Sequence, residues 1–262
     1  MTINQVLPEL TTSLKTLGLS GMLNSLESRR AQAVSNQMSH CDFLSLLVSD
    51  EILLRDNRRY ERRLRQANLS GYKTIENFDF TFNPKLNQAL IRDLATCLFI
   101  REKYPVLIVG PCGTGKSHLA QALGFCAIKQ GFDVVSSTQG QIADLLQSAK
   151  ATGSYEKKLK LLSKVPLLII DDFGLKPLKL AEEEVLHDLI NQRYEQTSTM
   201  ITSNLSVSEW CHAFNNKLLG AAMIDRLQHN AYSLILDGKS YRTSKTVEKK
   251  RGGLSEKIYI KN

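Results

Sequence analysis

The sequence predicts an α/β fold, a parallel five-stranded sheet flanked by helices, with a small all-helical domain in front of it. Three observations predict this fold. From about residue 105 onward, apolar segments of strand length alternate with segments of helical periodicity, as in the strand–helix–strand units of a parallel sheet. Before residue 68, apolar residues recur at helical spacing alone. Residues 106–117 join an apolar strand to the pattern G-x-x-x-x-G-K-S, which is found between a strand and a helix.

Residues 1–68 are expected to form the helical N-terminal domain. Apolar residues fall near helical spacing in its first part, and Gly18 is expected to interrupt the helix. Ser39 and Asp42 resemble a capping box, which predicts a second long helix over 42–66.

The second domain is expected over residues 81–238, after a linker at 69–80. Its predicted strands lie at about 105–110, 132–136, 166–170, 199–202 and 232–236. Its predicted helices lie at 116–129, 139–149, 155–164, 181–195 and 217–228. Residues 239–262 are rich in lysine and arginine and show little apolar periodicity, so we expect a basic C-terminal tail.

The pattern that begins at Gly110 predicts a phosphate-binding loop. Its glycines allow the tight turn that points successive backbone N–H groups inward, and the following helix directs its partial positive charge to the same place. In this pattern Lys116 reaches the β- and γ-phosphates, and the hydroxyl of Ser117 ligates Mg²⁺. We therefore expect ATP to bind together with Mg²⁺. The expected nucleotide-binding residues are Gly110, Pro111, Cys112, Gly113, Thr114, Gly115, Lys116, Ser117 and His118.

Two adjacent carboxylates follow the strand predicted at 166–170. A strand that is buried on both faces delivers the residue at its carboxyl end to the edge of the sheet where ligands bind. Asp171 is expected to hold Mg²⁺ there, and Asp172 is expected to polarise the water that attacks the phosphate. An ordinary polar turn after the strand accounts less well for two aspartates than for one.

Two further residues are candidates for a role in hydrolysis. Asn204 follows the strand predicted at 199–202 and is expected to bond the attacking water or the γ-phosphate; the alternative is a turn residue. Arg226 lies on the helix before the last strand, and we expect it to stabilise the transferred phosphoryl group across a subunit interface. A pair with Asp225 of the same chain, or a surface position, is the alternative for Arg226.

Composition limits the class of protein. Hydrophobic residues make up 42% of the 262 residues, which is enough for a buried core. No run of about 18 apolar residues occurs, so we expect no membrane span and a cytoplasmic location. The five cysteines include no C-x-x-C pair, so we expect reduced thiols rather than disulfides or a zinc site. The formal net charge of +8 favours a polyanionic partner such as nucleic acid.

Two basic clusters are candidate DNA-binding surfaces. The first lies near the end of the helix predicted at 42–66, where arginines are frequent and we expect most of the acidic partners at i±4 to be missing. The second flanks and occupies the helix predicted at 155–164. The alternative for a charged run is a solvated helix face. Neither cluster has a pattern that reads bases, so we expect weakly sequence-selective binding to duplex DNA that falls steeply with salt. The residues are Arg55, Arg58, Arg59, Arg62 and Arg63 in the first cluster, and Lys150, Lys157, Lys158 and Lys160 in the second.

Five motifs, in this order along the chain, resemble those of the IstB-like transposition helpers, which are AAA+ ATPases related to the DnaC-type helicase loaders. They are the phosphate loop, Leu167-Leu-Ile-Ile-Asp-Asp-Phe-Gly174, Thr202-Ser-Asn204, Asp225-Arg-Leu227 and Gly238-Lys-Ser-Tyr-Arg242. The resemblance extends to the N-terminal part through Leu17-Gly-Leu-Ser-Gly-Met-Leu23, Phe43-Leu-Ser-Leu-Leu47 and Asn57-Arg-Arg59. It therefore covers most of the chain.

The resemblance implies an ATP-dependent homo-oligomer that coats duplex DNA and serves a cognate transposase. It also implies that Asn204 is sensor 1, Arg226 the arginine finger and Arg242 the sensor 2 arginine. Asp172 departs from the glutamate of many AAA+ proteins. Only 26 residues follow the last predicted strand, so we expect the C-terminal lid to be reduced or absent and the nucleotide to be held chiefly between subunits. A helicase loader with the same ATPase core, or an ATP-switched DNA-binding scaffold with little hydrolysis, is the alternative.

Overall fold

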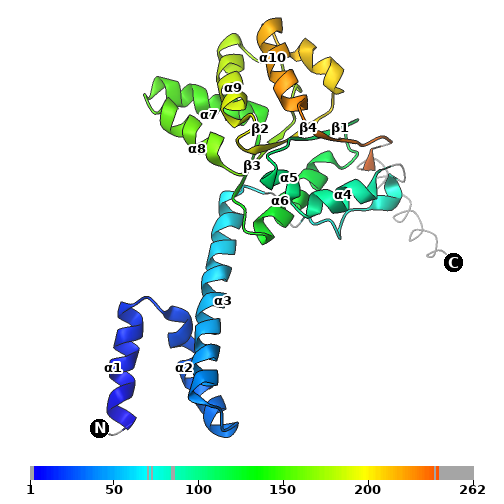
Figure 1. The fold of residues 1–262 in the computed structure, drawn as a ribbon. Helices are drawn as coiled ribbons and strands as arrows, with labels where there is room; N and C mark the ends of the chain where they lie inside the picture. The colour runs from blue at the N-terminus through cyan, green and yellow to red at the C-terminus, as the bar shows by residue number, and fades with distance from the viewer. Residues whose placement is uncertain (1–2, 70, 72, 84–85, 239, 242–262) are drawn as a thin grey trace, which may run out of the picture. The chain divides into compact units, whose positions relative to one another are not determined.

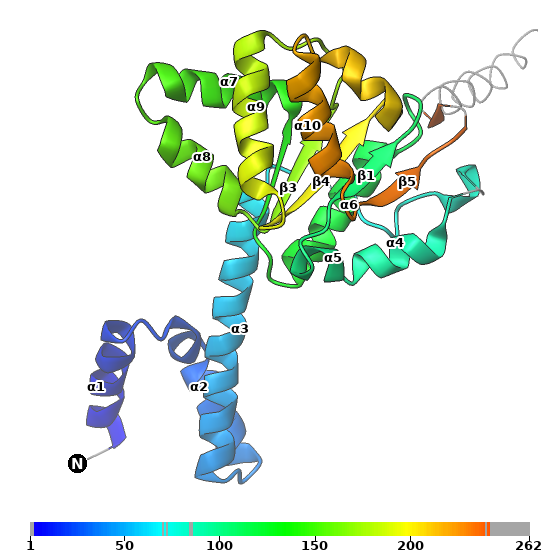
Figure 2. The same cartoon turned by 45° about the horizontal axis from the view of Figure 1, so that its top comes forward.

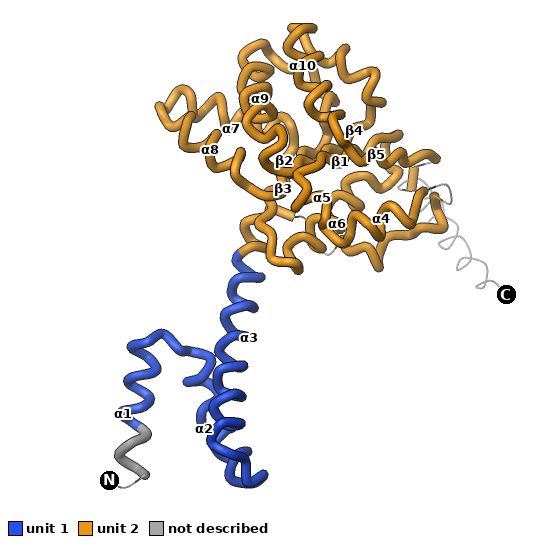
Figure 3. The backbone as a smooth tube through the Cα atoms, viewed as in Figure 1, with its two compact units in different colours: residues 1–62 blue, residues 63–262 orange. Residues whose placement is uncertain are grey.

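A computed structural model describes residues 3–69, 71, 73–83, 86–238 and 240–241 of the chain. The chain forms two compact units, residues 1–62 and 63–262, which are blue and orange in Figure 3. The last turn of helix α3 belongs to the second unit. The domain boundaries expected from the sequence stay a prediction.

The first unit consists of helices. α1 spans Ile3–Thr16, α2 spans Ser20–Ser35 and α3 spans His40–Gln66. The expected break between α1 and α2 is confirmed at Gly18, whose φ of +68° is a conformation that favours glycine. The long helix is confirmed as well, and the Asp42 N–H donates to Ser39 Oγ at 3.2 Å at its start.

A buried carboxylate joins α2 to α3. Glu51 is 4% exposed and accepts the backbone N–H groups of Gly21 at 2.5 Å and of Met22 at 3.3 Å, which the first turn of a helix leaves unpaired. Arg55 balances its charge at 2.6 Å. A Cβ on Gly21 would lie 2.6 Å from the Cα of Glu51, so only glycine permits this approach. The small apolar core of the unit contains Leu14, Leu26 and Leu47, with Leu19, Met22, Leu23 and Phe43 packed against it.

The second unit is built on a parallel sheet with the strand order β2-β3-β4-β1-β5. The strands are β1 (Val106–Val109), β2 (Val134–Thr138), β3 (Leu167–Asp171), β4 (Ser198–Ser203) and β5 (Tyr232–Ile235). Val106 aligns with Met200 on one side and with Tyr232 on the other. β1 and β4 are buried throughout, as expected for strands covered on both faces. The predicted fold class and all five predicted strands are confirmed.

Helices cover both faces of this sheet. α7, α8, α9 and α10 lie on one face, and α4, α5 and α6 lie on the other (Figures 1 and 2). Their bounds are α4 Gln88–Ala95, α5 Leu98–Arg101, α6 Lys116–Lys129, α7 Gln139–Ala151, α8 Tyr155–Lys164, α9 Leu180–Arg193 and α10 Lys217–Gln228, with 3₁₀ turns at Phe80–Phe82 and Val207–Ala213. The five predicted helices are confirmed. α4 and α5, with 8 and 4 residues, are too short for a periodic pattern to reveal.

The parallel topology gives the sheet two chemically different edges. The carboxyl edge, where the strands end, carries the loops after β1, β3 and β4; the amino edge, where the strands begin, carries Pro105 before β1 and Asn230 before β5. The largest buried side chains of the unit include Trp210, whose indole N–H donates to Ser203 Oγ at 3.0 Å. Of the helices in the described part of the chain, none is long and apolar enough to cross a membrane.

Candidate functional site

The loop between β1 and α6 adopts a turn that its glycines permit. Gly113 and Gly115 have φ values of +82° and +99°, which side chains larger than hydrogen rarely tolerate. At Gly110 the constraint is space, because a Cβ there would lie 1.9 Å from the carbonyl oxygen of Leu236. The loop ends at the N-terminus of α6, which begins at Lys116, so the N–H groups of the first turn and the positive end of the helix dipole face one place.

Lys116 directs its charge into this loop. Its side chain is 7% exposed, and its ammonium donates to the carbonyl oxygen of Pro111 at 2.7 Å. Thr114 Oγ1 donates to the same carbonyl at 2.9 Å. The loop is therefore closed by its own side chains, with the lysine charge at its centre.

The carboxylate of Asp171 faces the start of α6. Ser117 donates from Oγ to Asp171 Oδ1 at 2.9 Å, and Thr202 Oγ1 donates to the same oxygen. The ends of β3 and β4 and the first turn of α6 thus bring three possible oxygen ligands for a metal ion close together. This donor set fits Mg²⁺, which prefers carboxylate and hydroxyl oxygens and completes its shell with phosphates and water. Thr202 was not among the predicted site residues. The signal that could have revealed it is a hydroxyl at the end of the predicted strand that lies beside Asp171.

Asp172 has an unusual backbone conformation. Its φ of +57° is left-handed, and its N–H donates to Thr202 Oγ1 at 3.2 Å. Two residues on, the N–H of Gly174 donates to Gln139 Oε1 at 2.6 Å, and Phe173 is buried. The turn that carries Asp172 is therefore held from both sides, because residues with positive φ persist only where their surroundings fix them.

One cavity of about 730 Å³ collects these groups. The residues from Cys112 to His118 line it together with Asp171, Asp172 and Asn204. Gly110 and Pro111 form the start of the loop without lining the cavity. The rest of the lining is Lys73, Asn77, Phe78, Asp79, Phe82, Gln121, Leu175 and Tyr241.

Part of the lining of this cavity is aromatic. The rings of Phe78 and His118 meet edge to face with centroids 5.4 Å apart, and those of Phe82 and Tyr241 do so at 5.0 Å. His118 Nε2 lies 3.1 Å from the carbonyl oxygen of Thr74, and the N–H of Tyr241 donates to the carbonyl of Gly113 at 3.0 Å. Of these aromatic residues only His118 was a predicted site residue; the three phenylalanines between positions 78 and 82 were the signal that could have revealed the others.

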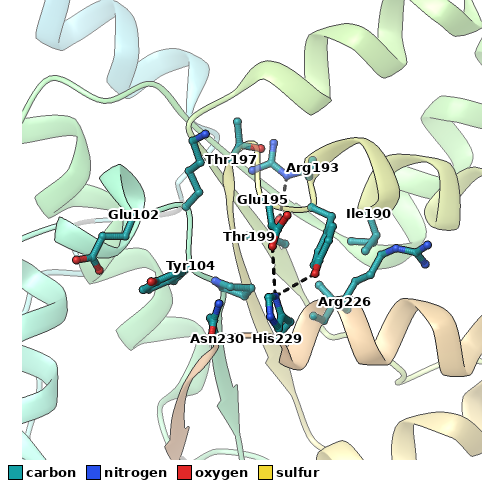
Figure 4. A pocket seen from close by; sticks show the side chains of 14 residues that line it. Glu102, Tyr104, Ile190, Arg193, Glu195, Thr197, Thr199, Arg226, His229 and Asn230 are labelled. Atoms are coloured by element: carbon teal, nitrogen blue, oxygen red, sulfur yellow. Dashed lines mark hydrogen bonds and ion pairs between the residues drawn. The ribbon is translucent and has the colours of Figure 1, made fainter.

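Arg226 lies away from this cavity. It lines a second cavity of about 320 Å³ at the amino edge of the sheet (Figure 4), and its Nη1 donates to the carbonyl oxygen of Ala222 at 3.1 Å. No residue lines both cavities. Among the described residues Arg226 has no carboxylate within 4 Å, so the alternative pair with Asp225 is not formed. Arg242, expected near the nucleotide, lies outside the described residues.

A buried arginine held by carbonyl groups supports the amino edge of the sheet. Arg193 is 1% exposed, and its guanidinium donates to the carbonyl oxygens of Leu162, Val165 and Ser198 and to Thr199 Oγ1. Burial lowers the pKa of Arg193 to about 9. The side chain therefore satisfies the carbonyl end of α8 and ties it to β4, and no sequence pattern revealed it.

The arginines of α3 are partly neutralised. Arg55 pairs with Glu51 at 2.6 Å, Arg59 with Asp56 at 3.2 Å, and Arg63 with Asp133 at 2.9 Å. The expectation that acidic partners at i±4 are missing is therefore wrong for Arg55 alone of these three. Asp56 lies three residues before Arg59, and the fold supplies Asp133 to Arg63. Arg58 and Arg62 are exposed, with no carboxylate within 4 Å in the described part of the chain.

The lysines of the second basic cluster also divide into one that lies near a carboxylate and others that, among the described residues, do not. Lys150 lies 3.7 Å from a carboxylate oxygen of Glu184 and 5.1 Å from the ring centroid of Tyr155. Lys157, Lys158 and Lys160 are exposed on α8, and none has a carboxylate within 4 Å among the residues described. α8 thus presents the more available charge of this cluster.

Comparisons with known proteins give one consistent result. A family model described as IstB-like ATP binding protein matches residues 12–249. An insertion sequence IS21 putative ATP-binding protein of Pseudomonas aeruginosa is 34% identical over 249 residues, which cover 95% of this chain and 93% of that protein. A putative ATP-binding protein in an insertion sequence of Mycobacterium tuberculosis is 36% identical over 239 residues, covering 91% and 95%.

Solved structures share the fold at lower identity. DnaA from Aquifex aeolicus bound to AMPPCP superimposes with a TM-score of 0.56 at 21% identity, over 74% of this chain and 58% of that one. The DnaC helicase loader superimposes with a TM-score of 0.53 at 24% identity, over 67% of this chain and 98% of that one. The chain therefore shares the fold of these proteins over about two thirds to three quarters of its length.

Proposed function

We propose, from the premise that this chain belongs to the IstB-like ATP-binding proteins of insertion sequences, that it is an ATPase which assembles on duplex DNA and helps a transposase. One observation carries the proposal. The phosphate loop, Asp171, Asp172 and Asn204 meet around a single cavity at the carboxyl edge of the sheet, where nucleotides bind in open α/β sheets.

The cavity provides separate places for the parts of ATP. The N–H groups of the loop and Lys116 suit the phosphates, and Ser117 with Asp171 would hold Mg²⁺, which neutralises phosphate charge when bound. The aromatic side chains of Phe78, Phe82 and Tyr241 in the lining suit a purine, because ring faces and edges favour stacked contacts.

Hydrolysis needs a group that positions water at the γ-phosphate. Asp172 lies one residue after the proposed metal ligand, and Asn204 lines the same cavity. We infer that Asp172 accepts a proton from the attacking water while Asn204 orients the water or the γ-phosphate.

The position of Arg226 favours an assembly of several copies of this chain. It precedes β5 at the amino edge, whereas the nucleotide cavity lies at the carboxyl edge, so it does not reach the nucleotide of its own chain. An arginine that acts on the phosphoryl group from this position belongs to a neighbouring copy. The proposed active unit is therefore a homo-oligomer with ATP sites between subunits.

Duplex DNA is the proposed polyanion. The exposed lysines of α8 and Arg58 and Arg62 of α3 supply charge that is not neutralised within the described residues, and they show no pattern that reads bases. Affinity is expected to fall by orders of magnitude between about 50 and 200 mM salt if several phosphates are contacted.

The test measures ATP turnover and particle size together, with and without duplex DNA of unrelated sequences, at low and high salt. Turnover stimulated by DNA and ATP-dependent growth into large, salt-sensitive assemblies are expected. A monomer that is indifferent to DNA overturns the DNA-bound assembly and leaves ATP binding in place. Preferential binding of a replicative helicase through residues 1–62, instead of a transposase, identifies a helicase loader.

A further inference from the structure

The cavity at the amino edge is lined by aromatic rings, apolar side chains and carboxylates (Figure 4). Tyr104, Ile190 and Leu227 supply apolar surface. Glu195 keeps 61% of its side chain exposed and lies 3.7 Å from His229. Tyr194 places its hydroxyl 3.0 Å from Nδ1 of the same histidine. The carboxylate is thus held at the mouth of the cavity and stays open to an outside cation.

Helix ends add negative potential to this cavity. α9 and α10 both end beside it, at Arg193 and Gln228, and the C-terminal end of a helix carries about half a negative charge. The guanidinium of Arg193 is engaged by carbonyl oxygens inside the fold, and Arg226 donates to its own helix. Lys103 also lines the cavity and is exposed, so the place for an apolar side chain with a cation next to it is at the carboxylate of Glu195.

A matching pair of residues borders the nucleotide cavity at the opposite edge. Leu175 is 53% exposed and lines the nucleotide cavity, and Lys176 is exposed with no carboxylate within 4 Å among the described residues. The turn behind them is fixed, because the N–H of Gly174 is bonded to Gln139 and Phe173 is buried. Leu175 therefore offers a firmly positioned apolar side chain to a partner that has a cavity to receive it.

We propose that Leu175 enters the amino-edge cavity of a second copy of this chain, and that Lys176 pairs with Glu195 of that copy. The inference rests on the proposed function, in which Arg226 acts on the nucleotide of a neighbour. Its geometry follows from that role: Arg226 must approach the γ-phosphate beside Asp172, and Leu175 lies three residues beyond Asp172 on the rim. The cavity that surrounds Arg226 then meets Leu175 and Lys176.

This contact joins different surfaces of two identical chains. Such heterologous contacts leave one free surface at each end, so they continue into a ring or an open helical filament. The carboxyl edge of one copy faces the amino edge of the next, which closes each nucleotide cavity with the neighbour's arginine.

The test reverses the charge on each side of the contact in the full-length chain. Lys176→Glu and Glu195→Lys are each expected to raise the concentration needed for assembly with ATP, Mg²⁺ and duplex DNA by about tenfold or more, because like charges at an interface are strongly unfavourable. Analytical ultracentrifugation measures this concentration. A one-to-one mixture is expected to recover assembly, because every contact then joins a lysine to a glutamate. Lys129→Glu, at the exposed end of α6 and outside both cavities, is the matched control and is expected to assemble like the parent.

The outcomes separate the contact from the function on which it rests. Thermal unfolding like that of the parent shows that each variant is folded. Assembly by both single variants at the parent's concentration, or no recovery on mixing, overturns the contact and leaves the proposed function in place. A parent chain that fails to assemble with ATP and DNA overturns the proposed function and the contact together.

Discussion

Ser117 and Asp171 are joined by a hydrogen bond of 2.9 Å from Oγ to Oδ1, although 54 positions separate them in the chain. Ser117 lies in the first turn of α6 and Asp171 ends β3. The bond connects the helix that follows the phosphate loop directly to the carboxylate at the end of β3. Both oxygens face the place where a cation bound to the β- and γ-phosphates is expected.

Lys116→Ala is expected to weaken ATP binding by roughly 10- to 150-fold, because hydrogen bonds to charged groups contribute about 1.5–3 kcal/mol. Titration with a fluorescent ATP analogue measures the affinity. Lys129→Ala removes a lysine from the exposed end of the same helix and is expected to bind like the parent. Unchanged affinity in Lys116→Ala would contradict the assignment of the phosphate loop.

Asp172→Asn is expected to retain ATP binding and to slow turnover by about 10²- to 10⁴-fold, the usual contribution of a general base. The variant suits the site because asparagine adopts positive φ more readily than most residues, and Asp172 has a φ of +57°. Single-turnover hydrolysis measures the chemical step, and nucleotide titration measures binding separately. Turnover within a factor of two of the parent would assign the water to another residue.

Arg226→Ala is expected to bind ATP and to hydrolyse it about 10³-fold or more slowly, as when an arginine finger is removed. Mixing it with Asp172→Asn is expected to restore part of the turnover, since mixed assemblies contain sites with one intact Asp172 and one intact Arg226. The control mixture contains Arg226→Ala and the double variant Arg226→Ala/Asp172→Asn, and it should stay inactive. If the first mixture recovers no turnover, Arg226 acts within its own chain and not on the nucleotide of a neighbour.

Alkylation of the cysteines is expected to depend on burial and on ATP. Burial raises the pKa of Cys97 to about 12, so its thiolate is scarce at pH 8 and its labelling should rise only as the pH approaches that value or as the chain unfolds. Because burial raises the pKa of Cys97 in the folded chain, the neutral thiol contributes its full stabilisation of the fold below the unfolded pKa near 9. This contribution is lost as the pH rises toward 12.

Cys112 and Cys41 provide the internal comparison. Both are exposed, and Cys112 lines the nucleotide cavity, whereas Cys41 lies in α3 of the first unit. ATP is expected to slow alkylation of Cys112 and to leave Cys41 unchanged, as peptide mass spectrometry would record. Equal rates at Cys112 with and without saturating ATP would place the nucleotide elsewhere.

Gly21→Ala is expected to destabilise the first unit by about 1–3 kcal/mol, the usual cost of overpacking. The added Cβ would lie 2.6 Å from the Cα of Glu51, and backbone atoms at this distance must move apart. Ser28→Ala, at an exposed position of the same helix, is the control and is expected to change little. Chemical denaturation followed by circular dichroism measures both, and equal stability of the two variants would contradict the close approach of α2 and α3.

Local patterns were sufficient for most of the second unit. Glycines, a lysine and a serine in fixed order specify the phosphate loop because each is needed within a few residues, and buried parallel strands read as continuous apolar runs. Short elements such as α5 escaped because four residues show no periodicity. The same local reasoning underestimated the acidic partners of the arginines in α3, since Asp133 approaches Arg63 only after folding.

The sequence by itself determined the fold class, the five strands, the phosphate loop and the order of Asp171, Asp172 and Asn204, because these depend on residue type and spacing along the chain. Tertiary structure alone decided which side chains meet. It placed Thr202 on Asp171, buried Arg193 among carbonyl groups, brought aromatic side chains into the lining of the nucleotide cavity, and set Arg226 at the opposite edge of the sheet. Hydrogen bonds and packing between distant segments fix these relationships, and they leave no periodic trace in the sequence.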